Sequence, residues 1–296
     1  MPPEEYGLDC ANKIPAIVAE TSEMLPTERA FVTGLIMHHQ PQKILELGVS
    51  SGSGTAVILN AIRDFENARL FSIDVMEQYW KDKSKPVGWV ASTLSPNLTK
   101  KMTLYKGKDA VQLMDEIGKA DFLVLDTAHM HPIETINFLC VLPYLKDGAI
   151  VVVHDISLYA LNKRGYMAES YAPRHLYNTI VAEKITPGAD YSPLPNIGAF
   201  QVTPETRKHV GNLFHLLYLP WGIPYANPWK RWISPELLDL YDSFVSRHYC
   251  EIHSKMFKDA IMAQEVIMKT VRIPSFILGN AWRILNGLRC WALKRT

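Results

Sequence analysis

The sequence predicts an α/β fold, in which a doubly wound, mostly parallel sheet has an antiparallel edge strand and a C-terminal helical appendage. Short, nearly continuous apolar segments alternate with segments of helical periodicity, which is typical of parallel strands buried on both faces. Several of these apolar segments end at or beside an acidic residue. Beyond residue 205 the composition changes to aromatic residues and proline, followed by further helical patterns.

The order of the elements follows from the same patterns. Residues 1–24 indicate a helical preamble, and residues 26–39 have apolar side chains at helical spacing. The segment "KILELGV" (43–49) predicts a first buried strand that ends in a glycine-rich loop. The elements expected after this loop are helix 55–65, strands 69–75, 101–107 and 120–126, helix 133–145 with an exit turn at 146–148, strand 149–155, helix 168–185 and an antiparallel edge strand 196–203.

Composition limits the classes of protein to which the chain can belong. Of its 296 residues, 48% are hydrophobic and 21% are charged, which is typical of a soluble globular protein. The net charge of +1 gives no global field that would attract nucleic acid. The first residues, "MPPEEYG", lack the pattern of a signal peptide, and no apolar run is long enough to span a membrane. We therefore expect a cytoplasmic protein with a main domain, residues 1–205, and a helical, aromatic-rich extension, residues 206–296.

Acidic residues stand at the ends of the predicted strands. They are Glu46, Asp74, Asp126 and Asp155. In a parallel sheet the carboxyl ends of the strands lie along one edge, where ligands bind near the topological switch point. Because the periodicity of a buried core does not explain these acids, we expect them to converge on a ligand site.

The loop "ELGVSSGSGT" (46–55) contains Gly48, Gly52 and Gly54. Glycine permits positive φ angles and a close approach of a ligand to the main chain. The spacing G-x-x-x-G-x-G differs from the dinucleotide pattern G-x-G-x-x-G, and no Gly-Lys-Ser/Thr follows as in a P-loop. Glu46 would also repel a pyrophosphate. The structural alternative is that these glycines only form a tight turn between strand and helix.

A cationic nucleoside fits this pattern better than a phosphate does. S-adenosylmethionine carries an amino group, a sulfonium, a ribose and an adenine, and it has no phosphate. Glu46, just before the loop, suits the cationic amino-acid end of this molecule. Asp74, at the end of the second strand, suits the ribose hydroxyls, because a carboxylate can accept hydrogen bonds from both.

Four segments in this order resemble the class I S-adenosylmethionine-dependent methyltransferases, namely "ILELGVSSGSGT", "FSIDV", "YKGKDAVQL" and "FLVLDTAHMHP…LKDGAIVVVHDI". The resemblance covers roughly residues 28–203 and implies a Rossmann-like sheet. The residues that it implies for the cofactor are Glu46, Gly48, Ser50, Gly52, Gly54 and Asp74 around the methionine and ribose, with Lys108 and Asp109 near the adenine.

The ends of the fourth and fifth strands resemble a subgroup that includes metal-dependent O-methyltransferases acting on sugars of macrolides and on related natural products. There, an Asp-x-x-His segment supplies a metal ligand and a catalytic histidine, and an adjacent acidic pair supplies two further ligands. Asp126, His129 and Asp155 match, whereas His154 replaces an acid. The resemblance implies catalytic roles for His129 and Asp126 and a divalent metal at Asp126, His154 and Asp155. The imidazole would favour manganese, iron or zinc over magnesium, and a site without metal stays open.

Taken together, these segments predict an S-adenosylmethionine-dependent methyltransferase that modifies a hydroxyl on a sugar or a glycosylated small molecule. Two alternatives remain, a nucleotide-dependent (NAD-type) oxidoreductase on the same fold and a catalytically silent protein that binds the cofactor and acts as an assembly partner. Helix caps or cofactor contacts are alternative roles for Asp126 and Asp155. A structural hydrogen bond is the alternative for His129.

The C-terminal third offers two further interpretations. Its aromatic residues form either a platform for the acceptor or, as we expect, a packing cluster, and they are Tyr218, Trp221, Tyr225, Trp229 and Trp232. Residues 275–296 have an apolar face flanked by Arg and Lys, which suits a membrane surface, the protein core or a second subunit. Peripheral membrane contact and a homo-oligomer therefore stay open, beside the small-molecule or saccharide acceptor.

Overall fold

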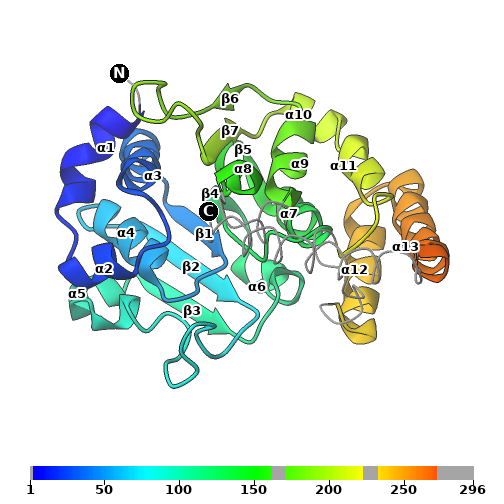
Figure 1. Cartoon of the computed structure of the whole chain (residues 1–296), viewed down its shortest axis with the longest axis horizontal. Helices are drawn as coiled ribbons and strands as arrows, with labels where there is room; N and C mark the ends of the chain where they lie inside the picture. Colours follow the sequence, from blue (N-terminus) through cyan, green and yellow to red (C-terminus); the bar gives the residue numbers. More distant parts are fainter. Residues whose placement is uncertain (1–2, 162–170, 223–232, 272–296) are drawn as a thin grey trace, which may run out of the picture.

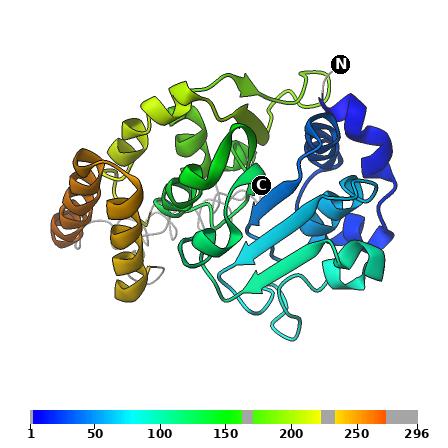
Figure 2. The ribbon, with the colours of Figure 1, turned by 180° about the vertical axis from the view of Figure 1, so that it is seen from behind.

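A computed structural model of the chain describes residues 3–161, 171–222 and 233–271. Within these residues a seven-stranded sheet has the order β3-β2-β1-β4-β5-β7-β6, and helices cover both of its faces (Figures 1 and 2). The strands are β1 Lys43–Leu47, β2 Arg69–Asp74, β3 Met102–Lys106, β4 Ala120–Leu125, β5 Leu145–His154, β6 Lys184–Ile185 and β7 Ile197–Gln201. The predicted doubly wound, mostly parallel sheet is confirmed.

The helices fill the connections and the C-terminal part. The N-terminal ones are α1 Pro3–Asn12, α2 Ala16–Thr21, α3 Pro26–His39, α4 Ser53–Ala61 and α5 Pro96–Thr99. The middle ones are α6 Met114–Ile117, α7 Ile133–Val141, α8 Leu158–Leu161 and α9 Ala172–Thr179. The last are α10 Pro204–Lys208, α11 Gly211–Leu216, α12 Pro235–His248 and α13 Glu251–Val271. Short 3-10 turns are η1 Ala91–Thr93, η2 Ala110–Gln112 and η3 Leu142–Tyr144.

The strand order places a topological switch point between β1 and β4. β1 pairs in parallel with both β2 and β4, so the sheet grows outward in both directions from this pair. β7 runs antiparallel to β5, as predicted for residues 196–203. However, β7 is not the edge strand, because the short β6 pairs with its other side. The carboxyl ends of β1, β2, β4 and β5 therefore share one edge of the sheet.

Alternate residues along each strand point into two separate cores. Ile44, Phe122 and Val152 belong to a cluster that packs against α3 and α4. Their neighbours Leu45 and Leu123 belong to the cluster that packs against α7, α9 and the C-terminal helices. The near-continuous apolar character of the strands follows from this burial on both faces.

The N-terminal and C-terminal helices are both tied to the central sheet. Glu4 of α1 is fully buried, and one of its carboxylate oxygens accepts a hydrogen bond from the backbone of Gly188. At the other end, Tyr241 and Phe257 of α12 and α13 join the same core cluster as β4 and β5. Trp221 is buried there too, which agrees with the packing role expected for it.

Two predicted segments differ clearly from the structure, and others lie outside its described part. The predicted helix 168–185 is only α9 in its described part, and its last residues form β6. The predicted exit turn 146–148 lies inside β5, which begins at Leu145. The amphipathic segment 275–296 and Tyr225, Trp229 and Trp232 lie outside the described residues. Within the described part of the chain, every helix is too short or too polar to cross a membrane.

Candidate functional site at the carboxyl edge of the sheet

The glycine loop between β1 and α4 is shaped by contacts within the protein. Gly48 has a φ of 88°, and a Cβ atom on it would lie 1.7 Å from the backbone oxygen of Asp126. Gly52 has a φ of 90°, and its Cβ would lie 2.8 Å from the Cα of Gly88. The two glycines thus allow the loop to contact the end of β4 on one side and the β2–β3 crossover on the other.

Glu46, predicted at the cationic end of the cofactor, lies behind this loop. Its side chain is 2% exposed and accepts hydrogen bonds from Thr55 Oγ1 at 2.8 Å and Ser72 Oγ at 2.6 Å. Burial raises the pKa of Glu46 to about 7, against the effect of these two hydrogen bonds. The carboxylate therefore connects β1, β2 and α4, and a contact with a cofactor stays a prediction.

Asp74 ends β2 directly opposite the glycine loop. One carboxylate oxygen accepts hydrogen bonds from the backbone N–H groups of Val49 and Ser50, at 2.9 and 3.0 Å. The other oxygen accepts from the backbone N–H of Met76 at 2.8 Å. The side chain remains partly exposed at the edge. Asp74 therefore fixes the loop, and its predicted role at the ribose would use the remaining lone pairs of the same carboxylate.

Lys108 and Asp109, predicted near the adenine, follow β3 and have different environments. Lys108 is exposed. Asp109 is buried and caps η2, because its side chain accepts a hydrogen bond from the Val111 backbone at 2.9 Å. Its second oxygen accepts from the hydroxyl of Tyr241 at 2.8 Å. Both oxygens of Asp109 thus have partners within the protein, and Lys108 has the more accessible side chain of the two.

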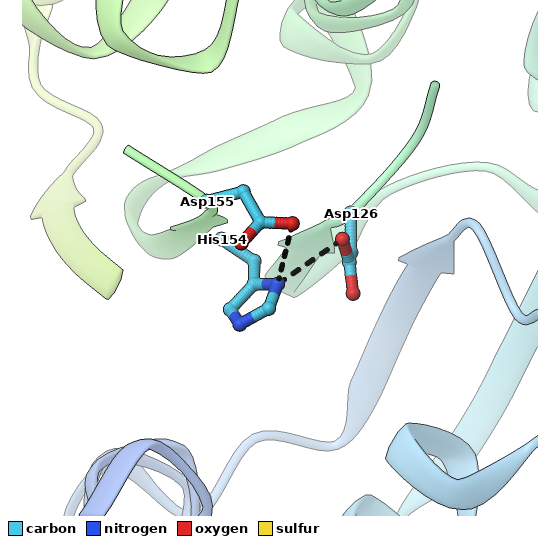
Figure 3. Close-up of side chains that lie close together, drawn as sticks. All are labelled: Asp126, His154 and Asp155. Atoms are coloured by element: carbon cyan, nitrogen blue, oxygen red, sulfur yellow. Dashed lines mark ion pairs between the residues drawn. The ribbon is translucent and has the colours of Figure 1, made fainter. Parts of the chain in front are cut away.

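Asp126, His154 and Asp155 meet where β4 and β5 end (Figure 3). The Nδ1 atom of His154 lies 3.2 Å from Asp126 Oδ1 and 3.4 Å from Asp155 Oδ2. One ligand atom from each of the three residues lies within 4.8 Å of the others. The structure therefore brings together the three residues that the sequence assigned to a metal.

The chemistry of this group fits a divalent metal. Two ligands of one metal with bonds of about 2.1 Å lie about 3.0 to 3.4 Å apart, and the observed spacings around His154 are 3.2 and 3.4 Å. Nδ1 of His154 is buried and has no partner of hydrogen-bond geometry among the described residues. Two carboxylates and one imidazole suit manganese, iron or zinc.

His129 lies beside this group. Its Nε2 atom is 3.0 Å from Asp155 Oδ2 and 3.8 Å from Asp126 Oδ1, and its side chain is 20% exposed. His129 and Asp155 have φ angles of 55° and 59°, a region that residues with a Cβ rarely adopt. Such strain concentrates at functional sites. His129 thus lies beside Asp126 and Asp155, and the catalytic roles of His129 and Asp126 stay predictions.

The pKa values of His154 and Asp155 are shifted by burial and by the charged members of this group. Burial would lower the pKa of His154, but the Asp155 and Asp126 carboxylates raise it well above its usual value. Burial would raise the pKa of Asp155, yet His154 holds the pKa of this carboxyl well below its usual value. A cation between these two carboxylates is therefore strongly favoured, whether it is a proton on the imidazole or a metal ion.

Three further polar residues support the site, and none was predicted. Asn196, directly before β7, donates a hydrogen bond to Asp155 Oδ1 at 2.6 Å. Glu134 in α7 accepts from Thr127, lies 4.0 Å from Nδ1 of His129, and has its pKa raised to about 7 by burial. Glu28 in α3 contacts Nε2 of His154 at 3.2 Å. Asn196 and Glu134 are polar residues at the ends of predicted elements, and this position is a signal by which the sequence could have indicated them. The only signal in the sequence for Glu28 is its place in the first turn of a helix.

Residues 45–156 match a family model described as a methyltransferase domain. This match includes the glycine loop, Asp74, Asp126, His129 and Asp155, and it leaves out α3 and the C-terminal helices. No match was found among the curated proteins.

Solved structures with similarity to the chain include three methyltransferases. The O-methyltransferase TomG from Streptomyces achromogenes, involved in tomaymycin synthesis and solved with SAM, is 16% identical with a TM-score of 0.48, over 69% of this chain and 99% of that one. The O-methyltransferase from Bacillus cereus, solved with SAH, is 14% identical with a TM-score of 0.47, over 66% and 91%. The SAH-bound methyltransferase PaMTH1 from Podospora anserina is 13% identical with a TM-score of 0.43, over 67% and 87%.

Proposed function

Residues 45–156 form a methyltransferase domain, and on this premise we propose that the chain transfers the methyl group of S-adenosylmethionine to a hydroxyl of a small acceptor. The family match confirms the predicted resemblance at the level of this domain. The observation that carries the proposal is the gathering of Asp126, His129, His154 and Asp155 at the carboxyl edge, next to the glycine loop.

The charge of this edge suits the proposed cofactor. Asp74 and Asp126 are partly exposed there. They stand at the carboxyl ends of β2 and β4, the two strands on either side of β1. A carboxylate attracts the sulfonium and ammonium groups of S-adenosylmethionine, whereas it repels the pyrophosphate of a dinucleotide. This charge pattern and the family match both favour the methyl donor over the NAD-type alternative.

The acceptor hydroxyl must be held in line with the methyl group and must lose its proton. When bound, S-adenosylmethionine supplies the reactive methyl group. His129 is the group that we propose as the base. The Nε2 atom of His129 lies 3.0 Å from Asp155 Oδ2. In the tautomer that carries its proton on Nε2, the lone pair on Nδ1 is available for the proton of the acceptor. The Asp155 carboxylate orients the ring and stabilises the imidazolium that forms.

Asp126, His154 and Asp155 would hold a divalent metal next to this base. A metal in this position supplies a Lewis acid that lowers the pKa of a bound hydroxyl. Without a metal, Asp126 and Asp155 would still orient the acceptor and His129 as hydrogen-bond acceptors.

A sugar hydroxyl, free or on a glycosylated small molecule, is the acceptor class that we propose. Sugar hydroxyls are weak acids, so their methylation benefits from both a base and a Lewis acid. A phenol loses its proton readily and needs less assistance. The combination of His129 with a candidate metal group therefore supports a sugar, as does the resemblance of the Asp-x-x-His segment.

Calorimetry with S-adenosylmethionine and its demethylated product tests the cofactor, and methyl transfer to a panel of glycosides and phenols tests the acceptor. We expect His129→Gln to lower kcat by about 10²- to 10⁴-fold while cofactor affinity stays unchanged. His209→Gln is the control, because this exposed histidine pairs with Glu205 on α10, outside the site.

Three results would count against the proposal. No binding of S-adenosylmethionine at millimolar concentration would overturn it. Thermal stabilisation by NAD, without stabilisation by S-adenosylmethionine, would favour an oxidoreductase. Cofactor binding without turnover on any acceptor, in protein without bound metal, would favour a catalytically silent assembly protein.

A further inference from the structure

We propose that Glu28, in the first turn of α3, is a positioning residue that holds the imidazole of His154 with Nε2 protonated and Nδ1 free to bind the metal. The inference rests on the metal site of the proposed function and adds to it a residue from outside the methyltransferase domain. The two side chains are 126 residues apart in the chain and lie 3.2 Å apart in space, between Nε2 of His154 and Oε2 of Glu28.

The alternation of β5 explains why this contact forms. Ile150 and Val152 point to the face of the sheet that α3 covers. His154 is the next residue of this series, so its ring extends toward the same helix. The opposite ring nitrogen, Nδ1, faces Asp126 and Asp155 (Figure 3). The ring therefore spans the distance between α3 and the candidate metal site.

The contact lies in a dry environment, where a hydrogen bond to a charged group is strong. The side chains of His154 and Glu28 are only 2% and 4% exposed. The other hydrogen bond that Oε2 of Glu28 accepts comes from the backbone N–H of Leu25, at 2.6 Å. Oε1 of Glu28 is buried and finds no partner in the described part of the chain.

The arrangement has a chemical consequence for His154. A carboxylate only accepts hydrogen bonds, so Nε2 of His154 must carry the proton that Glu28 binds. In the neutral ring the lone pair then resides on Nδ1, the atom that lies nearest to both aspartates. A carboxylate behind a metal-binding histidine fixes its tautomer and orientation, and its loss typically weakens metal binding by about 10- to 100-fold.

Glu4 offers a matched control in the same group of N-terminal helices. It is also fully buried, with one oxygen bound to a backbone N–H group, that of Gly188, and the other without a partner among the described residues. The same substitutions at Glu28 and Glu4 therefore remove equally buried carboxylates. Only the substitution at Glu28 removes the partner of His154.

Calorimetric titration of the full-length protein with Zn²⁺ tests the inference. Glu28→Leu should weaken zinc binding by about 10- to 100-fold. Glu28→Gln keeps an acceptor oxygen but makes it neutral, so a smaller loss of about threefold to tenfold is expected. Glu4→Leu and Glu4→Gln should bind zinc as the wild type does. If Glu28→Leu does not fold, the comparison of the two glutamine variants decides.

The tautomer gives a second readout that a purely structural role would not change. In zinc-loaded protein with ¹⁵N-labelled histidine, His154 should show a protonated Nε2 and a zinc-bound Nδ1. In Glu28→Gln the Nε2 proton should exchange with water faster than in the wild type. Zinc bound through Nε2 in the wild type would overturn the inference.

Failure of the inference can be told apart from failure of the proposed function. Equal zinc affinity of the wild type and both Glu28 variants would overturn the role of Glu28 and leave methyl transfer intact. A wild type that binds S-adenosylmethionine but no zinc would overturn the inference together with the metal site, and would leave the methyltransferase proposal standing on cofactor and base alone.

Discussion

At the scale of single residues, the carboxylates of the carboxyl edge differ in what surrounds them. Asp74 is partly exposed and accepts three backbone N–H groups. Glu46 is buried and has only hydroxyl donors. A buried carboxylate with only two hydroxyl partners favours its protonated form. Glu46 is therefore a site where stability depends on pH.

Replacing Glu46 by glutamine should remove a pH dependence from the stability. Burial raises the pKa of Glu46 from 4.5 to about 7 in the folded protein. The folded state thus binds the proton more tightly, so this contribution to stability is complete below the unfolded pKa and is lost as the pH rises through the folded one. The linked loss is about 3 kcal/mol.

Urea unfolding at about pH 5 and about pH 8 measures this effect. The free energy of unfolding of the wild type should fall between the two by about 2 to 3 kcal/mol more than that of Glu46→Gln. Glu66→Gln, at an exposed carboxylate, should behave as the wild type. Equal pH dependence in the wild type and Glu46→Gln would show that Glu46 is charged in the folded protein.

The sequence could predict some site residues and not others for a physical reason. Asp126 and Asp155 directly follow buried strands, His129 lies in the loop after Asp126, and the parallel sheet brings these positions together. Glu28 is visible in the sequence only as an acid in the first turn of a helix, a common stabilising position. Its contact with His154 depends on how α3 crosses the sheet, which no local pattern contains.

At the scale of elements, the loop from β1 to α4 depends on the absence of side chains. Its close contacts are to backbone atoms of Asp126 and Gly88, which cannot move aside as a flexible side chain would. Close backbone contacts within the protein therefore explain the glycines at positions 48 and 52, without a ligand. The edge acids, more than the glycines, favour a cationic cofactor.

Gly48→Ala should destabilise the protein far more than Gly118→Ala. Both glycines have positive φ, of 88° and 72°, so both substitutions cost about 1 to 3 kcal/mol in backbone strain. The alanine Cβ at position 48 would also lie 1.7 Å from the backbone oxygen of Asp126, whereas nothing lies within 4 Å at position 118. Urea unfolding compares the two variants, and equal losses would show that the end of β4 moves freely.

Element boundaries were predicted best where one pattern decides them. Residues 26–39 form α3 as expected, because Pro26 can begin a helix and the apolar spacing continues to its end. β6 was missed because it has two residues and depends on pairing with β7. The sequence predicts a turn at residues 146–148, although β5 already begins at Leu145, which pairs with Ala120 of β4. In both cases pairing between strands overrides the local preference of the sequence, which is helical at β6 and a turn at the start of β5.

At the scale of the whole molecule, the C-terminal helices are linked to the methyltransferase domain by a buried polar contact. The hydroxyl of Tyr241 in α12 donates to Asp109, the cap of η2, across 132 residues of chain. Both side chains are buried, with exposed fractions of 6% for Asp109 and 1% for Tyr241, and this burial raises the pKa of both groups. The division expected near residue 205 therefore does not separate the cores, since α12 and α13 share one with β4 and β5.

Tyr241→Phe should destabilise the entire molecule in one cooperative transition. It leaves one oxygen of the buried Asp109 without its donor, at a cost of about 1 to 3 kcal/mol. Tyr105→Phe is the control, because its hydroxyl binds Glu116 at the surface, and a change below about 0.5 kcal/mol is expected. Thermal unfolding followed by circular dichroism measures both. A separate early transition in Tyr241→Phe would show that the C-terminal helices unfold on their own.

The contact between Glu4 and Gly188 has a consequence for folding during synthesis on the ribosome. The partner of this buried carboxylate is made 184 residues later. At typical rates of synthesis this interval lasts about 10 to 40 seconds. During that time α1 cannot reach its final environment, and its acidic side chain must remain hydrated. The environment of α1 is thus completed long after this helix is synthesised, and cellular factors that bind nascent chains have a long interval in which to meet it.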